Sequence, residues 1–87
     1  MQLQELYNTI TKECNRYNLP LLLELDDVQL ILTELAGVPD EVLIDAGYGI
    51  ACDVACGLTV QQSTRYFKES IEMRRCALAQ VGSIPEL

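Results

Sequence analysis

The sequence predicts an all-α fold, a small four-helix domain made of two helical hairpins joined by short loops. Three observations support this. Apolar residues recur every three or four positions along most of the chain, which is the helical period. Glycine, proline and asparagine interrupt that period at three places. The chain has 87 residues, of which 49% are apolar, which is enough for one compact domain. We therefore expect a single domain over residues 1–82 and a short C-terminal tail over residues 83–87.

The first helix is predicted over residues 2–18. Its apolar positions follow the helical spacing and would form one buried stripe: Leu3, Leu6, Tyr7, Ile10, Cys14 and Tyr17. Asn18 is expected to end this helix. Pro20 suits the first turn of the next helix, where its missing N–H is harmless. Because so few residues separate the two helices, they should form a tight hairpin or a sharp corner.

The second helix, predicted over residues 20–36, is expected to be the central element. Its main apolar stripe comprises Leu21, Leu25, Val28, Leu32 and Leu35, widened by Leu22, Ile31 and Ala36. A second apolar pair, Leu23 and Leu30, falls on the opposite side of the same helix, bracketed by Asp26, Asp27 and Glu34. A helix that is apolar on two sides is either enclosed by its own domain or available to another chain. A short strand over 21–25 is the alternative, but the helical period runs through both halves.

The third helix is predicted from Pro39 to about Cys56, after Gly37 has ended the second helix in a left-handed conformation. Three small residues spaced by four, Gly47, Ala51 and Ala55, would form a groove along it. Glycine inside a helix costs about 1 kcal/mol relative to alanine. Close approach of another backbone is the expected compensation.

The fourth helix is predicted from a capping box to about Val81. Thr59 would be the N-cap and Gln62 would reach back to it, directly after Gly57 ends the third helix. Gly82 is expected to stop the helix. This helix also carries four of the six basic residues of the chain: Arg65, Lys68, Arg74 and Arg75.

The charge balance argues against nucleic-acid binding. The net charge is −7, and residues 1–58 contain ten acidic and two basic residues. Phosphate contacts need Lys and Arg, so a helix-turn-helix reading of the fourth helix meets repulsion from the rest of the molecule. The bases of the fourth helix are expected to pair instead with acids of the second and third helices, or with a protein partner.

No cofactor and no metal are expected. Cys52 and Cys56 are one helical turn apart, and with Cys14 and Cys76 they offer four sulfur ligands. However, the C-x2-C spacing of zinc knuckles is absent and three helices would have to converge. A Cys52–Cys56 disulfide is disfavoured by the geometry of side chains one turn apart.

Catalysis is not expected either. Asp45 and Asp53 are eight residues apart, about 12 Å along a helix, and the chain has no histidine and no nucleophile motif. The N-terminus lacks the basic and apolar regions of a secretory signal, and no stretch approaches the length needed to span a membrane. We therefore expect a cytoplasmic protein with reduced thiols.

Residues 44–73 resemble a single tetratricopeptide-type helical hairpin. The residues that match are a large-small pair at Ile50 and Ala51, then Val54, followed by Ser63 and Phe67 and by the small Ser70. The sequence departs from the family where an aromatic precedes the pair, here Gly47, and at the closing proline, here Arg75. The resemblance implies a helical module of the kind found in adaptors and chaperones that hold a partner helix.

The predicted function is a non-catalytic protein-binding module, such as a small chaperone, co-chaperone or adaptor, that holds an amphipathic helix of a partner. Its predicted binding residues are Leu23 and Leu30 as apolar anchors, with Asp26, Asp27 and Glu34 as an acidic rim. Two alternatives remain. The chain could be a small acidic inhibitor that occupies a basic, nucleic-acid-binding groove of its target, or a homo-oligomer that covers its spare apolar surface with its own copies.

Overall fold

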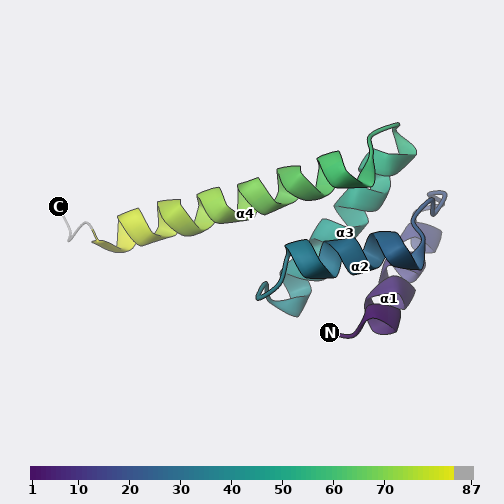
Figure 1. The fold of residues 1–87 in the computed structure, drawn as a ribbon, viewed down its shortest axis with the longest axis horizontal. Helices are drawn as coiled ribbons and strands as arrows, with labels where there is room; N and C mark the ends of the chain where they lie inside the picture. Colours follow the sequence, from purple (N-terminus) through teal and green to yellow (C-terminus); the bar gives the residue numbers. More distant parts are fainter. Residues whose placement is uncertain (84–87) are drawn as a thin grey trace.

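The computed structural model describes the backbone of residues 1–83 and the side chains of residues 1–75. It contains four helices: α1 (Leu3–Arg16), α2 (Leu25–Glu34), α3 (Asp40–Ala55) and α4 (Val60–Ser83). The all-α prediction is confirmed. Figure 1 shows α1, α2 and α3 forming a packed body, with α4 lying across it and continuing beyond it.

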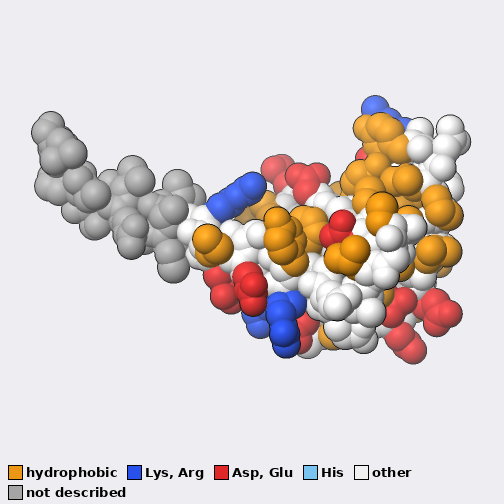
Figure 2. All heavy atoms as spheres, turned by 90° about the horizontal axis from the view of Figure 1, so that it is seen from above, with side chains coloured by type: hydrophobic (Ala, Val, Ile, Leu, Met, Phe, Trp, Pro, Cys, Tyr) orange, Lys and Arg blue, Asp and Glu red, His pale blue; other side chains and the backbone are white. Residues whose placement is uncertain are grey.

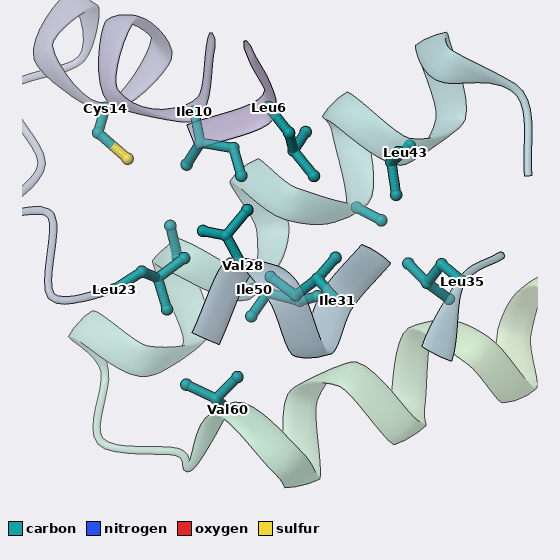
Figure 3. Packing of buried hydrophobic residues seen from close by; sticks show 12 residues of the cluster. Leu6, Ile10, Cys14, Leu23, Val28, Ile31, Leu35, Leu43, Ile50 and Val60 are labelled. Carbon is teal, nitrogen blue, oxygen red and sulfur yellow. The ribbon is translucent and has the colours of Figure 1, made fainter. Parts of the chain in front are cut away.

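All four helices contribute to one hydrophobic core (Figure 3). The predicted stripe of α1 is confirmed at its centre, where Leu6, Ile10 and Cys14 are buried, whereas Tyr17 is exposed. The remaining core residues come from the other elements: Leu23, Val28, Ile31, Leu35, Leu43, Ala46, Ile50, Ala51 and Val60. Burial of these side chains is the main source of stability in so small a domain.

The connection between α1 and α2 differs from the prediction. Asn18 does end α1: it adopts φ +57°, and the N–H of Leu19 donates to the Cys14 carbonyl at 2.8 Å. This is a Schellman motif, in which a left-handed residue turns the chain away from the helix axis. However, Pro20 does not begin the next helix, and residues 19–24 are not helical.

Residues 20–24 place alternate leucines on opposite sides, as an extended chain does. Leu21 is half-buried, Leu22 is 56% exposed, and Leu23 is 3% exposed. Helix α2 then begins at a capping box: the Glu24 N–H donates to Asp27 Oδ2 at 2.9 Å. The burial of Leu23 in the core favours this extended segment over the continuous helix that was predicted.

Two glycines allow neighbouring side chains to approach the axis of α3. A Cβ on Gly47 would lie 2.6 Å from Ile10 Cδ1, and a Cβ on Gly49 would lie 2.4 Å from Phe67 Cζ. At Gly47 the close neighbour is therefore a side chain of α1, and not the backbone that was predicted. Gly49 does the same for α4.

The connection between α3 and α4 follows the prediction. Gly57 adopts φ +109°, and the Leu58 N–H donates to the Asp53 carbonyl at 3.0 Å, which forms a second Schellman motif. The capping box is present: the Thr59 N–H donates to Gln62 Oε1 and the Gln62 N–H donates to Thr59 Oγ1, both at 3.1 Å. The glycine and the capping-box residues were therefore sufficient to predict this connection from the sequence.

Helix α4 is longer than predicted, because it runs through Gly82 to Ser83. A single glycine costs a helix only about 1 kcal/mol and need not end it. The rest of the predicted tail, residues 84–87, lies outside the described part of the chain. Residues 72–75 of α4, a full turn, are all exposed. From this turn onward α4 has left the body of the molecule, as Figure 1 shows.

Candidate functional site

An open groove runs between α2 and α4, with a volume of about 540 Å³. We call it the α2–α4 groove. It is lined by two residues of α2 and six of α4: Leu30, Glu34, Gln61, Thr64, Arg65, Lys68, Glu69 and Glu72. Two of the predicted binding residues, Leu30 and Glu34, therefore lie in the same surface depression. They are one turn apart on α2, so they face α4 together.

The groove combines a small apolar and uncharged lining with charges of both signs. Leu30 is half-buried, and Thr64 is 1% exposed. Lys68 Nζ lies 3.2 Å from Glu34 Oε2, which confirms that a base of α4 pairs with an acid of α2. Both side chains are more than two-fifths exposed, so this ion pair contributes little stability.

The other charged residues of the groove are unpaired. Among the described residues, Arg65, Glu69 and Glu72 have no ion-pair partner within 4.0 Å. Their charges are therefore available to an incoming surface. Thr64 differs from them, because its buried hydroxyl has no hydrogen-bond partner in the described structure. Such a group loses its hydration without compensation.

The other predicted binding residues lie elsewhere. Leu23 is a core residue, so the expectation that Leu23 and Leu30 share an exposed helix face is wrong. The reason is that Leu23 belongs to the extended segment and points inward, while Leu30 belongs to α2. Asp27 caps the start of α2. Asp26 is exposed in the first turn of α2, outside the groove.

A second apolar surface was not predicted. Tyr17, Leu22 and Leu58 are 55%, 56% and 44% exposed, and they lie in the connections that flank the body. Figure 2 shows hydrophobic side chains gathered at this end of the molecule, away from the α4 extension. The Tyr17 ring lies 5.6 Å from that of Tyr48. Exposed apolar patches are typical of interaction surfaces.

Tyr17 and Leu22 were predicted to lie in buried helical stripes. Tyr17 is the C-cap of α1 and Leu22 belongs to the extended segment, so neither occupies a helical position. The signal that was available is Asn18 with Pro20 two residues later. Asn18 favours a left-handed turn, and Pro20 favours an extended conformation of the residue before it.

The cysteines are distributed between interior and surface. Cys14 is buried, Cys52 is half-buried and Cys56 is exposed, and all three are free thiols. Burial raises the pKa of the Cys14 thiol, with smaller contributions in the same direction from Cys52 and Glu13. The side chain of Cys76 lies outside the described part. Within that part, no three metal-ligating side chains come together to hold an ion.

Asp45 and Asp53, the two aspartates of α3 that were considered for catalysis, have different environments. Asp53 Oδ2 accepts a hydrogen bond from Ser63 Oγ at 2.7 Å, which ties the end of α3 to the start of α4. Asp45 is exposed to solvent. Asp53 thus fixes the corner between two helices.

None of the helices, over the residues that the structure describes, combines the length and the hydrophobicity needed to cross a membrane. Comparisons with protein-family models, curated proteins and solved structures found no match to this chain.

Proposed function

We propose that this protein is a non-catalytic binding module that holds an amphipathic helix of a partner protein in the α2–α4 groove. The observation that carries the proposal is the placement of Leu30 and Glu34 together in an open groove of about 540 Å³ between two helices. A helix laid in such a groove extends a helical packing arrangement that the domain already uses.

The lining indicates what the partner helix should look like. Leu30 offers one apolar contact, so the partner needs an apolar anchor at the centre of its contact face. Around this contact the groove presents the acids Glu34, Glu69 and Glu72 and the bases Arg65 and Lys68. A partner face with charges of both signs beside its anchor fits this rim better than a uniformly basic or acidic one.

The biological role that we propose for this binding activity is that of a chaperone, co-chaperone or adaptor in the cytoplasm. It is supported by the groove and by the resemblance of residues 44–73 to a tetratricopeptide-type hairpin, which stays a prediction. The alternative, an acidic inhibitor of a basic groove, has less support. The acids at the start of α2 and at the start of α3 lie at opposite ends of α2 (Figure 1), so they do not form one continuous acidic surface.

The test is selection from a displayed library of helical peptides on the immobilised protein, with counter-selection on Leu30→Asp. We expect enriched peptides with apolar residues at i, i+3 or i+4 and i+7, which bind the wild type and lose affinity for Leu30→Asp. The matched control is Leu25→Asp, since Leu25 is an exposed leucine of α2 outside the groove. Equal binding to Leu30→Asp, or enrichment of acid-binding basic peptides without an apolar pattern, would reject the groove as the site.

A further inference from the structure

The outer face of α4 carries a further apolar feature, formed by two residues that do not line the α2–α4 groove. Tyr66 is 64% exposed and Met73 is 71% exposed, the two highest values among the large apolar side chains described. The two residues are seven positions apart, so they lie on the same side of the helix, about 20° from each other. They therefore form one stripe rather than two isolated exposures.

This stripe lies where α4 leaves the body. Residues 72–75 cover a full helical turn and all four are exposed, so the chain's own body covers little of the helix there. Helices without tertiary packing are marginally stable in water. A helix of 24 residues that is packed along only part of its length therefore needs a further contact to remain helical.

The charges beside the stripe have an order that matches an antiparallel copy of itself. Around the helix, Glu69 separates the stripe from a charged edge formed by Arg65 and Glu72. Antiparallel packing about a two-fold axis at Glu69 places Tyr66 against the partner subunit's Met73 on one edge, and Arg65 against the partner subunit's Glu72 on the other. Parallel packing in register would instead place the charged edge of Arg65 and Glu72 against the apolar stripe of the partner subunit, so neither pair would form.

We propose that two copies of this chain associate through α4, packed antiparallel with Tyr66 against the partner's Met73 and Arg65 against the partner's Glu72. The aromatic ring and the thioether sulfur are a favourable pair. Arg65 and Glu72 have no ion-pair partner within the described part of their own chain, so both are free for this role. The interface includes Arg65, Glu69 and Glu72, which also line the α2–α4 groove, but it leaves Leu30 out. Dimerisation and peptide binding therefore share charged residues but use different apolar anchors.

The arrangement also predicts an unfavourable contact. The two Glu69 carboxylates meet at the two-fold axis, where like charges repel each other. Glu69→Gln should therefore tighten the dimer severalfold, whereas removal of a solvated surface charge elsewhere should leave it unchanged.

The test is sedimentation velocity over a wide range of concentrations, on wild type and charge-reversed variants. We expect a concentration-dependent dimer for the wild type, and loss of association by tenfold or more for Tyr66→Ala, Arg65→Glu and Glu72→Arg. Because all three residues are exposed, the packed body of each variant should stay folded, and any loss of helical circular dichroism should be limited to the turns of α4 beyond the body. An equimolar mixture of Arg65→Glu and Glu72→Arg should restore the dimer, since each chain then meets opposite charges on its partner.

Two results would overturn the proposal: a wild type that stays monomeric up to millimolar concentration, or a mixture that fails to restore association. Leu30→Asp serves as the control that separates the two sites. It should remain dimeric while losing peptide binding in the groove.

Discussion

Leu22 and Leu23 are adjacent leucines with opposite predicted effects on stability. Leu23 is 3% exposed in the core and Leu22 is 56% exposed. Truncating a buried leucine to alanine typically costs about 2–5 kcal/mol, from lost transfer free energy and from the cavity left behind. Truncating an exposed one changes the free energy of unfolding by about 0.5 kcal/mol or less. A domain of this length has only about 4–13 kcal/mol of stability, at about 0.05–0.15 kcal/mol per residue.

Leu23→Ala should therefore lower the melting temperature by about 10 °C or more, at about 4–8 °C per kcal/mol for a domain of this size. Leu22→Ala should melt within about 4 °C of the wild type on the same basis. Urea and thermal unfolding followed by circular dichroism at 222 nm would measure both, with an unchanged urea m-value as the sign that the folded and unfolded states are comparable. A continuous helix from Pro20 reverses the expectation, because Leu22 then belongs to the buried stripe. Equal losses for the two variants, or a larger loss for Leu22→Ala, would refute the extended segment.

Three further predictions concern other parts of the core. Thr64→Val should stabilise the protein by about 1 kcal/mol in urea unfolding, because it removes a buried hydroxyl without a partner. The control Thr11→Val should not stabilise it, because the Thr11 hydroxyl donates to a backbone carbonyl at 2.8 Å. Gly47→Ala should destabilise by about 1–3 kcal/mol in the same assay despite the better helix propensity of alanine, since its Cβ meets a buried isoleucine. Cys14 should be alkylated much more slowly than Cys56 at pH 8 in mass-spectrometric labelling, because Cys14 is buried and its pKa is raised. Equal labelling rates would contradict the burial of Cys14. A folded-state pKa above the unfolded value also means that the contribution of Cys14 to stability is present below pH 9.0, the unfolded value, and is lost as the pH rises through the folded-state pKa.

The sequence predicted those parts of the fold that depend on local signals. Gly57, Thr59 and Gln62 set the backbone of the corner between α3 and α4, and each acts within a few residues of the chain. The start of α2 was missed because Leu21, Leu25 and Val28 match the helical period whether or not residues 20–24 are helical. Burial of Leu23 in the core, which is a tertiary contact, determines that this segment is extended.

The candidate site was likewise predicted only where a local sequence pattern was sufficient. Leu30 and Glu34 were predicted as binding residues from the pattern of α2 alone. The α4 wall of the groove was not, because Arg65 and Lys68 become groove residues only once α4 packs beside α2. No periodicity within either segment contains that information.

Gly49 affects the shape of the α2–α4 groove, although it does not line the groove. Phe67 sits over this glycine, and that contact sets how near α4 can come to α3. Helix α4 is also one wall of the groove. The spacing between the two walls therefore depends on the contact at Gly49, on the side of α4 that faces α3. An alanine at position 49 would push that wall outward, so a single methyl group hidden from any partner would change the shape that the partner meets.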